Sequence, residues 1–318
     1  APCPSGARCR PLPGAGPRGP RGGAAAVARV RGGIEKGLGT FEREGWSDDA
    51  SELHADPGAP PAPTVVRRGL PGLAGLGYEE VRFESAYRPP RGVPGADRWR
   101  SYRANRTVTG WMLRSGGFER PWVVCVHGYG MGQAATDLAV FQAARLRSAH
   151  GANVLSLVLP MHGPRSQRGA GPGELITTGV TNMWHCHSQA LSDVRRALAW
   201  LRSRGAERIA VHGISLGGNV AAMLGGVDAD VASIVVGVPA TDFTHSYREA
   251  AADEPGTAVP TRDDALWDDL RRFLRVASPF ALPVLLPREC LAIYAGEVDG
   301  AVPASSVEAL WSHWSEPE

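Results

Sequence analysis

The fold of this chain is decided by one segment, Arg208-Ile209-Ala210-Val211-His212-Gly213-Ile214-Ser215-Leu216-Gly217-Gly218-Asn219. Its first half is an apolar run, and its second half continues into Val220-Ala221-Ala222-Met223-Leu224, which is typical of a helix. Ser215 stands at the junction, with one glycine two residues before it and another two residues after it. Glycines there remove the side chains that would collide in a sharp strand-to-helix turn. The segment therefore predicts a turn that displays the Ser215 hydroxyl, which becomes a useful nucleophile only beside a base and an oxyanion site.

Composition excludes several classes of protein. The chain has 318 residues, of which 43% are hydrophobic and 21% charged, as in ordinary globular proteins. A net charge of +2 does not indicate a nucleic-acid partner, and no apolar run is long enough for stable insertion into a membrane. Two of the five cysteines, Cys125 and Cys290, lie in apolar runs where a buried thiol is the usual outcome. We therefore expect a reducing, cytoplasmic location.

Residues 1–77 differ in composition from the rest of the chain. They are rich in Gly, Pro, Ala and Arg, as in Pro11-Leu12-Pro13-Gly14-Ala15-Gly16-Pro17. A segment of this kind buries too little apolar surface to offset the entropy lost on ordering. We therefore predict a disordered N-terminal segment over residues 1–77.

Residues 78–318 alternate between apolar strand-like runs and amphipathic segments. The expected buried strands lie near residues 122–126, 153–159, 209–211, 231–236 and 290–294. The clearest helix runs from Asn182 to a capping Gly205, with apolar residues at spacings of three and four. This alternation predicts an α/β domain with a mostly parallel sheet and helices on both faces. Residues 240–288 interrupt the pattern with several prolines, and we expect them to form a lid insertion.

Four motifs, each after a predicted strand, resemble those of the α/β-hydrolase superfamily. The first is Val126-His127-Gly128-Tyr129-Gly130, and the second is Pro160-Met161-His162-Gly163-Pro164-Arg165-Ser166, with Met161 where the family usually has glycine. The third is the turn at Ser215. The fourth is Ala295-Gly296-Glu297-Val298-Asp299-Gly300-Ala301-Val302-Pro303. A single Gly-x-Ser-x-Gly match is weak, but four motifs in the family's order are specific.

The resemblance implies roles for particular residues. Ser215 would be the nucleophile, and the amides of Leu216 and Tyr129 would form the oxyanion hole. Asp299 would be the acid that orients the catalytic histidine, and Asp242 is the alternative acid. The chain is therefore expected to act as a serine hydrolase, of the carboxylesterase type, on a small-molecule ester or related acyl compound.

The catalytic histidine is the part of the triad that the motifs do not supply. In the family it follows the acid, but the chain ends at Glu318 soon after Asp299. His313 lies inside an expected helix at 304–314, where we interpret it as structural, and His245 could reach Ser215 only if the insertion folds inward. Two explanations stay open: the final strand and the histidine lie beyond Glu318, or the protein is a catalytically incomplete scaffold or binding protein.

The remaining sequence patterns predict neither a metal site nor a cofactor-binding site. His185 and His187 flank Cys186, but residues two apart on a helix point about 200° apart and do not readily share one ion. A dinucleotide site at Gly128 and Gly130 is disfavoured, because Gln133 stands where the third glycine would be. The sequence carries no signal for an oligomeric state.

Overall fold

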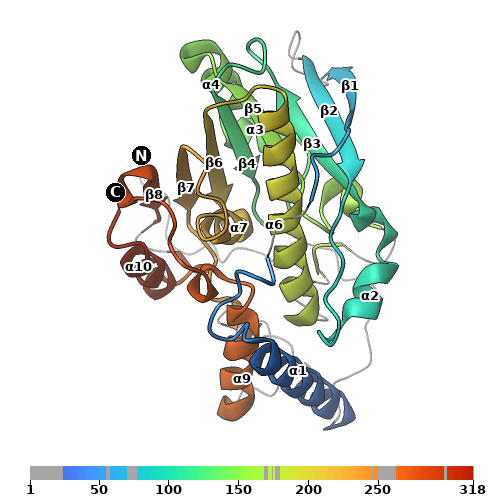
Figure 1. The fold of residues 1–318 in the computed structure, drawn as a ribbon. Coiled ribbons are helices and arrows are strands. Elements are labelled where there is room, and N and C mark those ends of the chain that lie inside the picture. Colours follow the sequence, from blue (N-terminus) through green and yellow to red (C-terminus); the bar gives the residue numbers. More distant parts are fainter. Residues whose placement is uncertain are drawn as a thin grey trace, which may run out of the picture.

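The computed structural model describes residues 24–54, 58–69, 77–167, 171–173, 175, 180–244, 247–248, 263–296 and 299–317. Their central feature is an eight-stranded sheet (Figure 1). Its strands are β1 (Thr64–Gly69), β2 (Gly77–Glu84), β3 (Thr107–Leu113), β4 (Trp122–Val126), β5 (Asn153–Leu157), β6 (Ile209–Ile214), β7 (Ser233–Gly237) and β8 (Leu291–Tyr294).

The sheet begins antiparallel and becomes parallel. The strand order is β1-β2-β3-β5-β4-β6-β7-β8, and β1, β2, β3 and β5 pair antiparallel in turn. From β5 through β4, β6 and β7 to β8 every pair is parallel. Parallel neighbours end at the same edge, so the loops after β4, β5, β6, β7 and β8 gather there. The predicted fold class, an α/β-hydrolase-like and mostly parallel sheet, is confirmed.

Helices cover both faces of this sheet. Their bounds are α1 (Ala24–Glu44), α2 (Ala96–Ser101), α3 (Ala134–Val140), α4 (Ala143–His150), α6 (Val180–Ser203), α7 (Leu216–Leu224), α9 (Asp264–Arg275) and α10 (Ala304–His313). Short 3₁₀ turns occur at η1 (Arg103–Arg106), η2 (Gly163–Arg165), η3 (Pro279–Ala281) and η4 (Arg288–Cys290). None of the helices in this described part is both long and apolar enough to cross a membrane.

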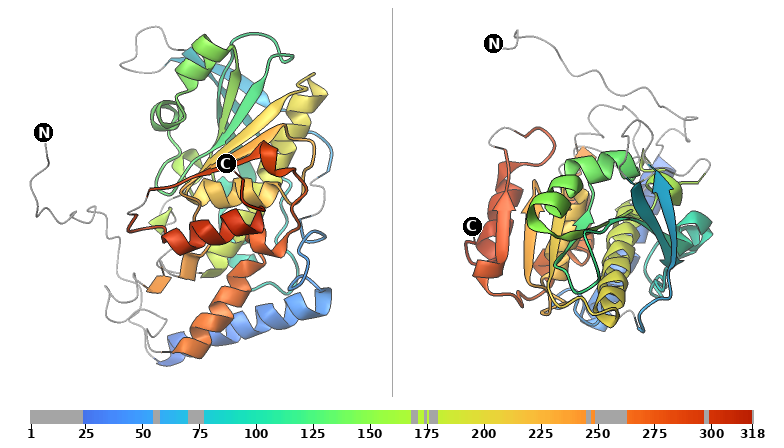
Figure 2. Two further views of the ribbon diagram at one scale, coloured as in Figure 1. Left: turned by 90° about the vertical axis from the view of Figure 1, so that its left-hand side faces the viewer. Right: turned by 90° about the horizontal axis from the view of Figure 1, so that it is seen from above.

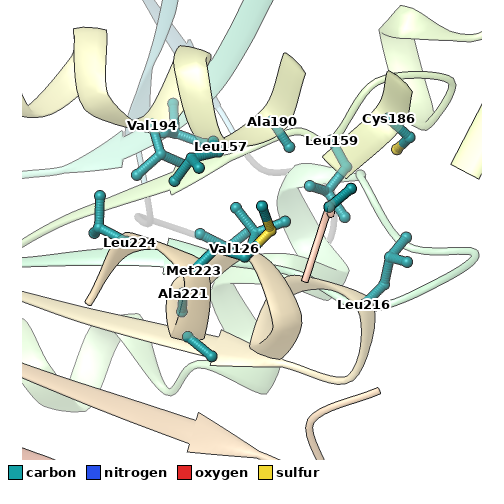
Figure 3. Packing of buried hydrophobic residues seen from close by; sticks show 14 of the residues in the cluster. Val126, Leu157, Leu159, Cys186, Ala190, Val194, Leu216, Ala221, Met223 and Leu224 are labelled. Atoms are coloured by element: carbon teal, nitrogen blue, oxygen red, sulfur yellow. The ribbon is translucent and has the colours of Figure 1, made fainter. Parts of the chain in front are cut away.

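Strand alternation divides the interior into two cores. In β4, Val124 and Val126 belong to the larger core, which includes the buried faces of α6 and α7 (Figure 3). Cys125 points the other way, into a smaller core with residues of α3 and the first residue of α4. The view from above in Figure 2 shows α3 and α4 on one side of the sheet and α6 on the other. A strand buried on both faces is the physical reason for the unbroken apolar run at 122–126.

Part of the segment predicted to be disordered is folded in the structure. Within residues 1–77, α1 forms a 21-residue helix and β1 adds an edge strand to the sheet. The apolar face of α1 packs on the larger core, where the fully buried Phe41 contacts the rings of Trp184 and Phe273, which also contact each other. The overlooked signal is the spacing of three and four between apolar residues of α1: Val27, Val30, Ile34, Leu38 and Phe41. Residues 1–23 lie outside the described part.

The predicted insertion at 240–288 contributes α9, which lies against α1 (Figures 1 and 2). Its buried side includes Trp267 and Phe273, both without exposed surface. Gly37 of α1 accommodates this contact, because a methyl group there would lie 2.5 Å from Cε2 of the Phe273 ring. The N-terminal helix therefore holds the insertion onto the body of the domain.

A buried ion pair connects the loop after β5 to α6. One Arg165 nitrogen, Nη2, donates to Asp193 at 2.7 Å and to the Asn105 carbonyl at 2.8 Å, and Nη1 donates to the Val158 carbonyl. Both side chains are almost completely buried, with exposed fractions of 1% and 3%. A buried pair of this kind contributes little net stability, but removing one partner strands a charge in the interior.

We expect Asp193→Asn to lower the free energy of unfolding by about 3–5 kcal/mol, because it leaves the Arg165 charge uncompensated inside the protein. Urea denaturation followed by circular dichroism measures this change. Arg100→Ala, which breaks the exposed pair with Asp97 on α2, is the matched control and should leave the unfolding midpoint near that of the parent. Equal unfolding midpoints for Asp193→Asn and the parent would show that the Arg165 charge does not need Asp193 as its partner for stability.

Candidate active site

Ser215 occupies a strained backbone position between β6 and α7. Its φ is 54° and its ψ is −115°, outside the regions that residues with a side chain ordinarily adopt. Three hydrogen bonds hold this conformation: the Ser215 N–H donates to the Gly237 carbonyl, and the Ser215 carbonyl accepts from Ala240 and Asn219. The hydroxyl makes no capping bond to α7, and the residue is partly exposed. The sharp strand-to-helix turn predicted from the sequence (here called the elbow) is therefore present at Ser215.

The flanking glycines are required by close packing. A methyl group on Gly217 would overlap the carbonyl oxygens of Val126 and His127, at the end of β4. On Gly213 it would overlap the carbonyl oxygen of Gly217. The first turn of α7 thus rests directly on the backbone of the neighbouring strand, which only glycine permits.

The loop after β4 (residues 127–132, here called the oxyanion loop after the role that its motif predicts) lies beside Ser215. A methyl group built on Gly128 would be 3.3 Å from Cβ of Ser215. His127 is fully buried; its Nδ1 lies 2.7 Å from the Gly128 carbonyl, and its Nε2 accepts from the Leu159 N–H at 3.0 Å. Nε2 is therefore the acceptor and Nδ1–H the donor. In a trans peptide the N–H points opposite to the C=O, so the Tyr129 N–H points away from His127.

Leu216 is the first residue of α7, so its N–H has no carbonyl partner within the helix. The helix dipole adds positive potential at this end. Ser215, Leu216 and Tyr129 are thus brought to one edge of the sheet, as the motif order predicted.

The two candidate acids follow β7 and β8 at the same edge. Asp299 is partly buried, and its Oδ1 accepts the N–H groups of Ala301 and Val302 at 2.8 and 3.1 Å. Asp242 accepts from the backbone and hydroxyl of Thr244, and its Oδ2 lies 3.8 Å from Nε of Arg271. Asp242 therefore has a cationic partner, whereas the hydrogen bonds to Asp299 from described residues both go to Oδ1.

Several of the described histidines make structural contacts. His127 uses both nitrogens, and His313 on α10 packs edge-on against Phe280 of η3. His185 bonds to Pro94 and Tyr87, while His187 packs against Phe243. His245, together with residues 297–298 of the fourth motif, lies outside the described residues. Within the part of the chain that the structure describes, no three His, Cys, Asp or Glu side chains are arranged to hold a metal ion.

One buried acid next to the oxyanion loop was not identified from the sequence. Asp137 in α3 has no exposed surface, and burial raises its pKa to about 6. Its Oδ1 accepts the Gly132 N–H at 3.0 Å, and its Oδ2 accepts Nε1–H of Trp111 at 3.1 Å. The available signal was an aspartate in the first turn of a helix that begins Ala134-Ala135-Thr136 and continues with Leu138.

Sequence comparison identifies relatives from Mycobacterium tuberculosis that match most of this chain. An uncharacterized protein of Mycobacterium tuberculosis (strain CDC 1551 / Oshkosh) is 36% identical over 294 residues, which cover 90% of this chain and 68% of the relative. An uncharacterized protein of strain ATCC 25618 / H37Rv is 35% identical over the same shares. No family model matches the chain.

Among solved structures, the acetyl xylan esterase from Paenibacillus sp. R4 is similar in fold. It superposes with a TM-score of 0.56 over 91% of this chain and 90% of its own, at 16% sequence identity. The superposition shows that the two proteins share a fold. At 16% identity it shows nothing about the reaction, which has to be argued from the residues of the site.

We expect Gly217→Ala to disrupt the packing of α7 on the end of β4. The added methyl group would overlap the carbonyl oxygens of Val126 and His127. The thermal unfolding midpoint should fall by several degrees or the protein should fail to fold. Gly33→Ala on α1 is the control, since its methyl group would meet only Cβ of Pro94, at 3.9 Å. A Gly217→Ala protein as stable as Gly33→Ala would contradict the packing of α7 on β4.

Acidification should destabilise the fold. Burial lowers the pKa of five imidazoles to between about 3 and about 4: His54, His127, His162, His185 and His187. The unfolded chain binds protons at these sites below pH 6.5 and the folded chain does not, so the free energy of unfolding falls as pH drops from about 6.5 to 4. Burial raises the pKa of Asp137 and Asp193, which offsets only part of this loss.

Urea titrations at pH 7.0, 6.0 and 5.0 measure this dependence. His187→Leu removes one buried imidazole that accepts no proton in the folded state, so its stability should fall less steeply with acid than that of the parent. A parent stability that is flat or rises over this range would contradict the burial of these imidazoles in their neutral form.

Proposed function

Because this chain belongs to the α/β-hydrolase superfamily, in one family with the two mycobacterial relatives, we propose that it is a serine hydrolase that cleaves a carboxylic ester or related acyl compound. The observation that carries the proposal is the backbone of Ser215, held at φ 54° and ψ −115° with its hydroxyl uncapped beside the oxyanion loop. Strain of this kind persists only where the surroundings enforce it, and it is concentrated at functional sites.

Two amides are proposed to stabilise the developing oxyanion. The Leu216 N–H lies at the positive end of α7, and the Tyr129 N–H is turned away from His127 by the bond to Gly128. Preorganised donors of this type lower the barrier to acyl transfer by about 3 kcal/mol each. Their position next to Ser215 supports attack on a carbonyl carbon rather than a binding role for the turn alone.

The proposed reaction proceeds through an acyl-enzyme. Oγ of Ser215 bonds to the carbonyl carbon while its proton passes to a histidine base, and that proton then leaves with the alcohol as the ester bond breaks. Water, activated by the same base, releases the acid and restores the hydroxyl. Asp299 is proposed to orient the base through its second oxygen. The Paenibacillus protein of this fold is named as an esterase, which is in keeping with an ester substrate here.

One observation favours a second candidate function. Among the described residues, no histidine is hydrogen-bonded to Ser215 or to Asp299, and His127 uses both of its nitrogens in contacts with the backbone. Without a histidine base the fold would serve as a catalytically incomplete scaffold or binding protein for acyl compounds. The two functions predict opposite outcomes with a reagent that bonds to an activated serine.

We expect a fluorophosphonate probe to label the protein at Ser215, with loss of fluoride. Ser215→Ala should abolish labelling and lower kcat/KM for p-nitrophenyl acetate by roughly 10⁴-fold, since the nucleophile is removed. Gel fluorescence and p-nitrophenol release at 405 nm provide the two readouts, and Ser101→Ala on exposed α2 is the control. Labelling that survives in Ser215→Ala would remove Ser215 from the mechanism, and an unlabelled parent would support the scaffold.

A further inference from the structure

Asp137 is a buried carboxylate whose position calls for an explanation. It lies in the smaller core among apolar residues of β3, β4, β5 and α3, with no exposed surface. No cation pairs with it among the ion pairs of the described residues. Burying a carboxylate without a cation is costly, so its hydrogen bonds have to satisfy both oxygens. Two donors do so: the backbone N–H of Gly132 bonds to Oδ1 and Nε1–H of Trp111 bonds to Oδ2.

One of these donors, Gly132, is the last residue of the oxyanion loop. Gly132 has φ +102° and packs tightly against the loop after β5; a methyl group there would lie 3.0 Å from the Gly163 nitrogen and 3.1 Å from Cβ of His162. The Asp137 carboxylate thus fixes the backbone at the point where the oxyanion loop meets both α3 and the neighbouring loop. The other donor, Trp111, anchors the carboxylate to β3.

The other end of the loop is held by His127, through its bonds to Gly128 and Leu159. Between these two anchors Tyr129 and Gly130 are exposed, and the ring of Tyr129 leans edge-on against His162. The backbone between the anchors carries the Tyr129 N–H. Its direction therefore depends on both anchors, not on His127 alone.

We propose that Asp137 is a positioning residue that fixes the oxyanion loop, and with it the Tyr129 N–H, by accepting the backbone N–H group of Gly132. The proposal rests on the proposed function for its catalytic consequence, but the anchoring of the loop stands independently of it. Protonation would turn one carboxylate oxygen into an O–H donor facing an N–H donor, and one of the anchoring bonds would be lost.

The surroundings of Asp137 make it the group that titrates near neutral pH. The pKa of Asp137 is raised to about 6 by burial. The facing groups on other elements stay neutral there: the pKa of the Cys125 thiol on β4 is raised by burial, that of His162 is lowered to about 3, and that of Tyr78, against the Trp111 ring, is raised. Trp111 contributes an uncharged N–H. The oxyanion loop should therefore loosen as pH falls through about 6.

Amide hydrogen exchange of the intact protein tests the anchoring directly. In Asp137→Asn, exchange at Gly132 should accelerate about tenfold or more at pH 7, because one acceptor oxygen is replaced by an N–H₂ donor. In the parent, protection at Gly132, corrected for intrinsic exchange, should fall below pH 6, and in Asp137→Asn this pH dependence should vanish. Thr136→Ala, at the exposed neighbouring position, is the matched control. Parent-like exchange at Gly132 in Asp137→Asn would overturn the proposal.

Trp111→Phe provides a second variant, because it keeps the aromatic packing and removes one donor to the carboxylate. The loss should raise the pKa of Asp137, so the midpoint of the protection change should move to higher pH than in the parent. An unchanged midpoint would overturn the claim that Asp137 is the group that titrates. The midpoint in Trp111→Phe can be measured even if Asp137→Asn does not fold.

Kinetics separate this inference from the proposed function. With p-nitrophenyl acetate, Asp137→Asn should lower kcat about tenfold and leave KM within about twofold, since the loop acts on the transition state. Accelerated exchange with unchanged kcat would show that the loop does not position an oxyanion donor. Absence of Ser215-dependent labelling would instead refute the serine hydrolase, while hydrogen exchange at Gly132 would still decide whether Asp137 anchors the loop.

Discussion

The structure of the candidate site depends on the contact between the first turn of α7 and the end of β4, where no side chain intervenes. Gly217 lies against the carbonyl oxygens of Val126 and His127, and Gly213 lies against the carbonyl of Gly217. This contact brings the elbow and the oxyanion loop together and forces Ser215 into its strained conformation. The hydrogen bonds to Gly237 and Ala240 on the β7 side then hold the turn from the opposite direction.

Around this contact, buried polar and charged groups keep the loops in place. His127 acts as donor to one end of the oxyanion loop and acceptor for Leu159, which requires the neutral imidazole. Asp137 holds the other end, and the Arg165–Asp193 pair fastens the loop after β5 to α6. Buried polar groups interact strongly with their hydrogen-bond partners because the local dielectric constant is low, and losing a partner costs much stability. We therefore expect this edge of the domain to be rigid and sensitive to single substitutions.

The sequence predicted the parts of the structure that follow from local patterns. Unbroken apolar runs marked the parallel strands, since burial on both faces leaves no room for polar alternation. The glycine spacing around Ser215 indicated the elbow because only one local geometry requires it. The triad acid stays a prediction at Asp299, and no described histidine completes it.

Other features depend on contacts between segments that are distant in the sequence, and the sequence pattern therefore did not predict them. Helix α1 is stabilised by Trp184 and Phe273, far along the chain, which outweighs the glycine and arginine content that suggested disorder. Asp137 looked like an ordinary residue of a first helical turn, and its role appears only once β3 places Trp111 beside it. Residue pattern alone does not specify such pairings.

The most direct test of the central claim is a crystal structure of the protein after reaction with a small alkyl fluorophosphonate. The account predicts a phosphorus–oxygen bond to Ser215, with one phosphonyl oxygen about 2.7–3.1 Å from the backbone nitrogens of both Leu216 and Tyr129. An adduct whose oxygen points to solvent, or a reagent bound to a different side chain, would contradict it.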